Sequence, residues 1–183
     1  MFNEDSPFIE EDIRHQRHFN VIDHHVLNFK GRTLLPERLV RGRSVIDLGS
    51  CLGAMGEWAL RHGATKYVGI EIQKDLADKS KKLLQHWGDK AEIHQTDVRT
   101  FLQHCEDNSF DVVVAAGMLY AFIDPTTILR EMCRVGKRTI SIETNNPPLI
   151  RSGSLDDSAP IIEIALTGMN LSSGGSPPRK RGG

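Results

Sequence analysis

The sequence has few cysteines, no long hydrophobic run and almost no excess charge over its 183 residues. Its three cysteines, Cys51, Cys105 and Cys133, are an odd number at wide spacing, so we expect reduced thiols and neither a disulfide framework nor a metal site. The apolar runs have the length of strands, so no membrane span is expected. A net charge of −1 argues against a nucleic-acid-binding domain. The acidic start lacks a signal-peptide pattern, so we expect a cytoplasmic protein.

A chain of this length predicts one domain with a buried core. Residues 1–12 are polar and predict a frayed start, and a helical pattern follows over residues 13–29. We expect four successive regions: a helical cap, a nucleotide-binding core, a segment with a sixth strand, and a disordered, low-complexity tail. Their boundaries are predicted at residues 1–42, 43–150, 151–171 and 172–183.

The strongest local signal is an apolar run that ends on Asp47 and is followed by a glycine-rich turn and a helical stretch. This succession predicts strand, tight turn and helix, the first unit of a parallel α/β sheet. Gly49 and Gly53 can take a positive φ and let a ligand approach the backbone closely. The N–H groups at the start of the helix can bind an electronegative ligand, although a tight turn without a ligand would have the same pattern.

A second strand is predicted over residues 66–71 and ends on Glu71. An acid at the tip of this strand can accept hydrogen bonds from both hydroxyls of a ribose. This arrangement fits several nucleotide cofactors, NAD among them, and the alternative is an exposed glutamate at a strand end. The sequence therefore predicts a nucleotide site without choosing the nucleotide.

Three further strands are predicted at residues 91–94, 109–116 and 138–143. The second of these is a near-continuous apolar run, as is typical of a buried central strand. It ends at Ala116-Gly117, and Asp124-Pro125 then begins a helix. Asp97 suits the N-cap of a short helix, so a structural role is open for it beside any role in binding. Residues 160–166 predict a sixth strand.

These stretches, in this order, resemble the class I methyltransferases that depend on S-adenosylmethionine, over residues 43–146. The resemblance rests on Asp47-x-Gly49-x-x-x-Gly53, on Glu71, on Asp97-Val98, and on Ala116-Gly117-Met118-Leu119-Tyr120 with Asp124-Pro125. It points to the small-molecule branch. It implies a Rossmann-like doubly wound, mainly parallel α/β sheet of order 3-2-1-4-5, with helices on both faces and an incomplete C-terminal strand pair. Cys51 replaces the family's middle glycine, and Ala121 replaces a histidine.

The resemblance implies S-adenosylmethionine as cofactor and gives each motif a part in holding it. Glu71 would bind the ribose, and Asp97 would accept the exocyclic amine of the adenine while the Val98 backbone reaches the ring. The full set of cofactor-binding residues expected is Asp47, Gly49, Ser50, Cys51, Gly53, Glu71, Ile72, Asp97, Val98, Ala116 and Gly117. No catalytic base is identified, and Tyr120, His24 and His25 are the candidates.

The sequence therefore predicts a methyltransferase that acts on a small molecule. A nicotinamide-dependent oxidoreductase is an alternative, but no Tyr-x-x-x-Lys pair is evident. Cys51, Ala121 and the short C-terminal part favour a non-catalytic cofactor-binding module or a partial domain. A nucleic-acid methyltransferase is disfavoured by the charge and by Asn146-Pro147-Pro148, which follows the fifth predicted strand and reads as a loop. The acceptor, the oligomeric state and any partner chain that completes the sheet or the site are left open.

Overall fold

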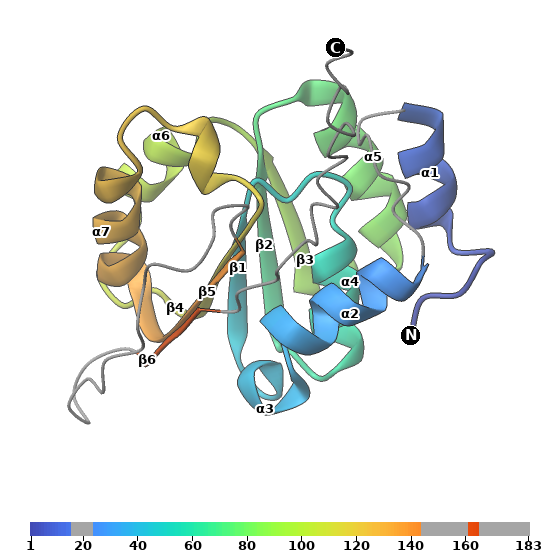
Figure 1. Ribbon diagram of the computed structural model, residues 1–183, viewed down its shortest axis with the longest axis horizontal. Helices are drawn as coiled ribbons and strands as arrows, with labels where there is room; N and C mark the ends of the chain where they lie inside the picture. Colours follow the sequence, from blue (N-terminus) through green and yellow to red (C-terminus); the bar gives the residue numbers. More distant parts are fainter. Residues whose placement is uncertain (16–23, 144–160, 165–183) are drawn as a thin grey trace, which may run out of the picture.

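A computed structural model of the protein describes residues 1–15, 24–143 and 161–164, and its strands form one parallel sheet (Figure 1). The strand order is β3-β2-β1-β4-β5-β6, so the predicted order 3-2-1-4-5 is confirmed. The strands are β1 (Ser44–Leu48), β2 (Lys66–Glu71), β3 (Ala91–Gln95), β4 (Phe110–Ala116), β5 (Gly136–Glu143) and β6 (Ile161–Ile164). β6 pairs in parallel with β5, and no antiparallel strand lies between them in the described part of the chain.

Helices cover both faces of the sheet, as predicted (Figure 1). Their bounds are α1 (Pro7–His15), α2 (His24–Leu34), α3 (Glu37–Val40), α4 (Ala54–Arg61), α5 (Lys74–Leu84), η1 (Gln85–Lys90), α6 (Val98–Gln103), η2 (Leu119–Ala121) and α7 (Pro125–Val135). α1, α2, α4 and α5 lie on one side, and α6 and α7 on the other. Successive strand residues point to opposite faces. Val45 and Val112 therefore pack under the first group of helices, whereas Ile46 and Val113 pack under the second.

The N-terminal residues are folded onto the domain, so the prediction of a frayed start is wrong. Phe2, Phe8 and Ile9 are buried, and the Phe2 and Phe8 rings meet edge to face. The Phe2 amide donates to Asn28 Oδ1 at 2.9 Å, and Asn28 Nδ2 donates to the Phe2 carbonyl at 2.8 Å. The sequence interpretation failed because it weighed the acidic residues of this segment and not its three apolar side chains, whose burial docks the helix.

The second helix of this cap packs on α4 through a glycine. A Cβ atom on Gly31 would lie 2.2 Å from Cδ2 of Trp58, so only a glycine admits the indole at this point. Trp58 Nε1 donates to the Leu35 carbonyl at 2.9 Å and fixes the ring. This contact with Trp58 therefore attaches the cap to the domain, and it does not depend on polar contacts elsewhere. The helix predicted over residues 13–29 includes the end of α1 and the start of α2, and its middle lies outside the described residues.

Several other predictions also fall outside the described residues. These are the loop at Asn146-Pro147-Pro148 and the low-complexity tail at 172–183. The predicted sixth strand is present in part, as β6. In the part of the chain that the structure describes, no helix is both long and apolar enough to cross a bilayer.

Candidate functional site

A cavity of about 470 Å³ opens beside the carboxyl ends of β1, β2 and β4. Strand order reverses at β1, which pairs with β2 on one side and with β4 on the other. Ligands of open α/β sheets bind at such a switch point, and the volume is in the range of small-molecule sites. The cavity is lined by Phe8, Leu27, Lys30, Asp47, Gly49, Ser50, Cys51, Leu52, Ala54, Met55, Glu71, Gln73, Leu76, Ala116, Gly117 and Met118.

The turn after β1 forms one wall and is bonded to β2. The amides of Gly49 and Ser50 both donate to the Ile70 carbonyl at 2.9 Å. Gly49 has a φ of +75°, and a Cβ there would lie 3.1 Å from Cβ of Met118, so the residue both turns the chain and admits the segment after β4. Cys51 also has a positive φ, of 52°, although it carries a side chain. The predicted glycine-rich turn is therefore held in a tight, partly strained form.

Glu71 presents a fixed carboxylate at the end of β2. The residue is 6% exposed; its Oε2 accepts from the Cys51 amide at 2.9 Å, and its Oε1 accepts from the Gln73 amide at 2.8 Å. Each carboxylate oxygen has a second lone pair. The group can therefore accept two more hydrogen bonds without losing those that position it, which is what the two hydroxyls of a ribose require.

Asp47 is a buried carboxyl at the end of β1, 2% exposed. Tyr67 Oη donates to its Oδ2 at 2.9 Å. Burial raises the pKa of Asp47 to about 7; the Tyr67 hydrogen bond and the Lys30 charge oppose this rise, and the Glu71 charge adds to it. Burial likewise raises the pKa of Tyr67, so the phenol stays protonated. A cationic ligand group beside Asp47 would favour the charged carboxylate.

Lys30 and Glu143 form an ion pair that the sequence reasoning missed. Lys30 Nζ lies 2.8 Å from Glu143 Oε2, and Glu143 is 3% exposed at the end of β5. The Gly117 amide, in the cavity wall, donates to the Glu143 carbonyl at 3.1 Å. A weak signal was present, because the alternation of β5 puts Glu143 on the face opposite Ile142, the face that α2 covers. No local pattern could pair two residues that lie 113 positions apart.

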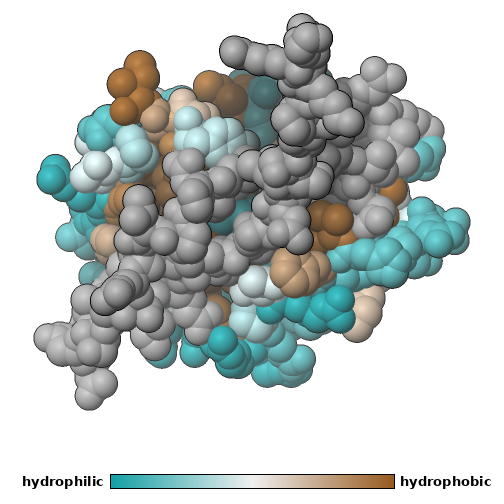
Figure 2. Space-filling view, in the orientation of Figure 1, coloured by the Kyte–Doolittle hydropathy of each residue, from teal (hydrophilic) through white to brown (hydrophobic). Residues whose placement is uncertain are grey.

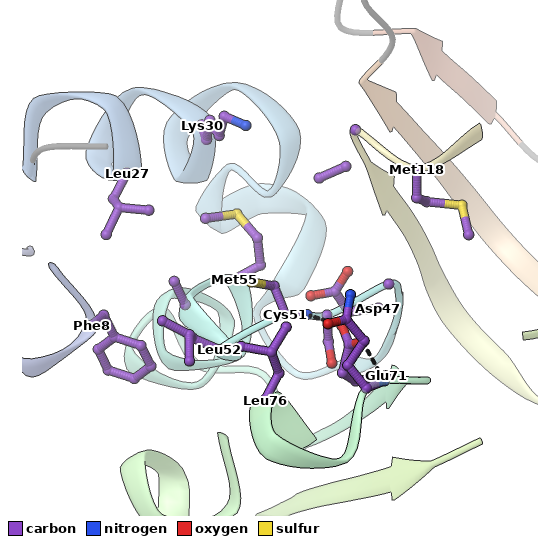
Figure 3. A pocket seen from close by; sticks show the side chains of 16 residues that line it. Phe8, Leu27, Lys30, Asp47, Cys51, Leu52, Met55, Glu71, Leu76 and Met118 are labelled. Atoms are coloured by element: carbon purple, nitrogen blue, oxygen red, sulfur yellow. Dashed lines mark hydrogen bonds between the residues drawn. The ribbon is translucent and has the colours of Figure 1, made fainter. Parts of the chain in front are cut away.

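The cap and the neighbouring helices give the cavity an apolar side. Figure 3 shows Phe8, Leu27 and Leu52 on the left and Leu76 near the centre, whereas Asp47 and Glu71 lie on the right and Lys30 lies at the upper left. Phe8 comes from α1, which the sequence did not predict as a cavity wall, and Leu27 comes from α2, in the predicted helix over residues 13–29 for which a lid over the pocket was the less favoured interpretation. The site therefore combines an apolar surface, two buried carboxyl groups and a lysine.

Seven of the eleven predicted cofactor residues line this cavity: Asp47, Gly49, Ser50, Cys51, Glu71, Ala116 and Gly117. Gly53 does not line the cavity. It is the N-cap of α4 and has a φ of +80°. A Cβ there would lie 2.4 Å from Ser80 Oγ, so the glycine makes room for α5. Ile72 directly follows Glu71 and is 59% exposed, outside the lining.

Asp97 and Val98 also lie outside the lining. Asp97 Oδ1 accepts from the amides of Arg99 and Thr100 at 2.9 and 3.2 Å, so its predicted role as an N-cap is confirmed. Val98 is the first residue of α6, is 7% exposed and packs in the core between the sheet and the helices α6 and α7. For Gly53, Ile72, Asp97 and Val98, contact with a cofactor stays a prediction.

None of the three candidate bases lines the cavity. Tyr120 lies in η2 and is 59% exposed. His24 and His25 begin α2, with ring centroids 3.9 Å apart. A base therefore stays unidentified.

Figure 2 shows a largely hydrophilic coloured surface from which a hydrophobic group projects at the upper left, over the region of η2 and α7, where Tyr120 and Ile123 are exposed.

Comparison with known proteins points to one family. A family model described as a methyltransferase domain matches residues 46–139, just over half of the chain. None of the curated proteins matches the chain. Among solved structures, an S-adenosylmethionine-dependent methyltransferase from Mesorhizobium loti is 23% identical, with a TM-score of 0.50, covering 59% of this chain and 47% of that one.

Two other structures are similar at comparable identity. A candidate RNA methyltransferase from Pyrococcus horikoshii is 21% identical, with a TM-score of 0.51, covering 60% of this chain and 56% of that one. A candidate S-adenosylmethionine-dependent methyltransferase from Methanococcus maripaludis is 19% identical, with a TM-score of 0.54, covering 79% and 68%. At these identities the likeness shows the fold alone. This chain matches about half the length of the first two.

Proposed function

Because this chain belongs to the family of methyltransferase domains, whose cofactor is S-adenosylmethionine, we propose that it transfers a methyl group from S-adenosylmethionine to a small-molecule acceptor. The observation that carries the proposal is Glu71. Its buried carboxylate is fixed by two backbone amides at the wall of a cavity that could hold a nucleoside. The domain division proposed with it is a core at residues 43–150 under a cap at residues 1–42.

The residues at the cavity fit such a cofactor. Glu71 would hold the ribose hydroxyls, and Asp47 would face the ammonium group of the methionine part. The remaining wall, at Gly49, Cys51 and Gly117, offers backbone at close range. Ile72, Asp97 and Val98, which continue from the ends of β2 and β3, stay proposed contacts of the adenine.

When bound, the cofactor supplies a methyl group that is activated by the sulfonium. The chain's own contribution would be positioning and exclusion of water. Phe8 and Leu27 of the cap and Met55 of α4 cover the cavity with apolar surface. The buried carboxyl groups of Asp47 and Glu71 favour a positively charged ligand beside them. Holding two reactants in line accounts for much of the rate of such a transfer, so a weak base suffices.

Two observations bear on the acceptor. The net charge of −1 and the small, capped cavity favour a small molecule over a polyanion. The similarity to the candidate RNA methyltransferase favours a second function, methylation of nucleic acid. A non-catalytic cofactor-binding module is the third alternative, because the chain matches only about half of some relatives. A cytoplasmic location belongs to the same proposal.

Calorimetric titration with S-adenosylhomocysteine, with NAD as the control ligand, tests the cofactor. Binding of S-adenosylhomocysteine alone is expected. Binding of NAD alone would replace the proposal by an oxidoreductase, and binding of neither would contradict methyl transfer by this chain.

Transfer of labelled methyl from S-adenosylmethionine tests the acceptor. The protein is incubated with ultrafiltered cell metabolites in one reaction and with total cell RNA in another. Label in a small-molecule fraction is expected. Label in RNA alone would establish the second function, and binding without label in either would favour the non-catalytic module.

A further inference from the structure

The cap and the sheet meet over the cavity at the ion pair between Lys30 of α2 and Glu143 of β5. We infer that Lys30 binds the carboxylate of the cofactor's methionine part, and that Glu143 is a positioning residue that holds Lys30 in place for it. The inference rests on the proposed function, because it names a contact of the proposed cofactor. It adds two residues that the motifs of the chain do not include.

The charges around the cavity carry the first step. Among the described residues that line it, Lys30 is the one with a positive charge, and Asp47 and Glu71 are acidic. Glu143 adds a third carboxylate beside Gly117. An α-amino acid group brings an ammonium and a carboxylate together. Asp47 suits the ammonium, whereas Lys30, as the cationic side chain of the lining, suits the carboxylate.

The position of Lys30 supports the same assignment. Lys30 belongs to α2, at the upper left of Figure 3, and lines the same cavity as Asp47 and Glu71. The Lys30 charge already acts on Asp47, since it lowers the pKa of that carboxyl against the effect of burial. Asp47 and Lys30 would therefore face the two opposite charges of one amino-acid group.

Glu143 restricts the rotamers of the Lys30 side chain. A lysine side chain loses much rotamer freedom when it is fixed, so a prearranged lysine binds more tightly than a free one. Glu143 is buried at the end of a sheet strand, and its own carbonyl is bonded to Gly117. An ammonium has three N–H donors, so Lys30 can keep Glu143 and donate to a ligand carboxylate together.

A purely structural role is the alternative, in which the pair only attaches the cap. The cap is already attached by Gly31 against Trp58 and by the hydrogen bond from Trp58 Nε1 to the Leu35 carbonyl. Lys30 is moreover 21% exposed at its side chain, which leaves part of the ammonium accessible. If the role is structural, loss of Lys30 should affect the binding of all ligands alike. If Lys30 binds the carboxylate, its loss should affect only ligands that carry the amino-acid group.

The test compares two probes, S-adenosylhomocysteine and 5′-methylthioadenosine, by calorimetric titration. The second probe has the adenosine and the sulfur but lacks the amino-acid group. Lys30→Met is expected to weaken binding of S-adenosylhomocysteine about tenfold or more and to change that of methylthioadenosine less than about twofold. Lys30→Arg should retain most of the affinity. Lys66→Met, which removes a half-exposed lysine paired with Glu92 and outside the cavity, is the matched control.

Glu143→Gln tests the positioning role. This variant should weaken the binding of S-adenosylhomocysteine by a smaller factor, about threefold, and leave the affinity for methylthioadenosine unchanged. Because Glu143 acts through Lys30, the double variant should bind no more weakly than Lys30→Met alone. Thermal unfolding of each variant checks that the fold is retained, and Lys30→Gln replaces Lys30→Met if the latter does not fold.

The outcomes separate this inference from the proposed function. If the wild-type chain binds no S-adenosylhomocysteine, both are overturned. If it binds but Lys30→Met weakens both probes equally, or neither, the proposed function stands and the inference falls. Tighter binding of S-adenosylhomocysteine by Glu143→Gln would also overturn it, because Glu143 would then compete for Lys30.

Discussion

Two neighbouring strands each carry an aspartate, at opposite ends of the sheet. Asp47 lies at the carboxyl end of β1, and Asp111 lies at the amino end of β4. Asp111 Oδ2 accepts from the Ser44 amide at 3.0 Å and from Ser44 Oγ at 3.1 Å, and Arg138 Nε lies 3.4 Å from Oδ1. Asp47 has a phenol donor from Tyr67 and almost no contact with solvent.

The pKa values of Asp47 and Asp111 are shifted in opposite directions, which distinguishes the two ends of the sheet. Burial acts to raise the pKa of both groups. In Asp111 burial is outweighed by the hydrogen bonds from Ser44 together with the charges of Lys137 and Arg138, and the pKa is lowered. In Asp47 burial dominates, and the pKa rises to about 7. A carboxylate paired with its neighbours holds the fold together, whereas a buried carboxyl with a raised pKa at a cavity wall is a candidate for ligand binding.

The largest effect is expected from Asp47→Asn, in the pH dependence of stability. The pKa of Asp47 is above its ordinary value of 3.8, so the folded state keeps a proton that the unfolded state loses as the pH rises from there to about 7. By linkage, this group favours folding at low pH relative to high pH. The free energy of unfolding therefore falls by up to about 4 kcal/mol as the pH rises across that window. The variant keeps an oxygen acceptor for Tyr67 and has no such dependence.

Urea unfolding of both proteins below, within and above this window measures it. The free energy of unfolding of the wild type, minus that of Asp47→Asn, should fall as the pH rises. A constant difference would show that Asp47 titrates normally, and the contrast with Asp111 would disappear.

The next effect is on binding, at the other acid of the carboxyl end. Glu71→Ala removes the proposed ribose partner and leaves the amides of Cys51 and Gln73 without their acceptor. Affinity for S-adenosylhomocysteine should fall at least about 100-fold, or about 3 kcal/mol, by calorimetry. Glu92→Ala, which removes a half-exposed partner of Lys66, is the control and should bind normally. Equal affinity of the two variants would exclude Glu71 from the site.

The sequence was sufficient where function and fold use the same local pattern. Asp47 and Glu71 each end a strand whose apolar residues identify it, so their positions follow from the strands. The order of the sheet and the cavity at its switch point follow from the same resemblance. Gly53 shows the limit of this reasoning, because packing against Ser80 of α5 is by itself a reason for a glycine there, and its contact with a ligand stays a prediction.

The parts that were missed depend on contacts between distant segments. Lys30 looked like one polar residue of a cap helix, and its role appears only when α2 lies over the end of β5. The histidines at the start of α2 received attention because of their chemistry, yet neither lines the cavity. Phe8 became a cavity wall because α1 docks, which a polar composition concealed.

A smaller effect is expected at the amino end, where Asp111→Ala should lower stability by about 1–2 kcal/mol without affecting ligand affinity. The substitution leaves the half-buried Ser44 amide without its acceptor. The pKa of Asp111 is below its ordinary value, so its contribution is present above 3.8 and is lost as the pH falls through the lowered pKa, opposite to Asp47. Urea unfolding at several pH values measures this. A loss of S-adenosylhomocysteine affinity would contradict a purely structural role.

The smallest effect concerns the backbone, where both ends have a residue with a side chain at positive φ. Cys51 has a φ of 52° beside the cavity, and Asn108 has a φ of 55° before β4. Asparagine tolerates this conformation and cysteine does not, so strain is stored at the carboxyl end alone. Cys51→Gly relieves it but gives the unfolded chain more freedom, for a net gain below about 1 kcal/mol; Asn108→Gly should lose about 0.5 kcal/mol. Chemical denaturation of the two variants in parallel measures the difference. A loss in both would mean that Cys51 is as relaxed as Asn108, and the two ends would then differ in charge only.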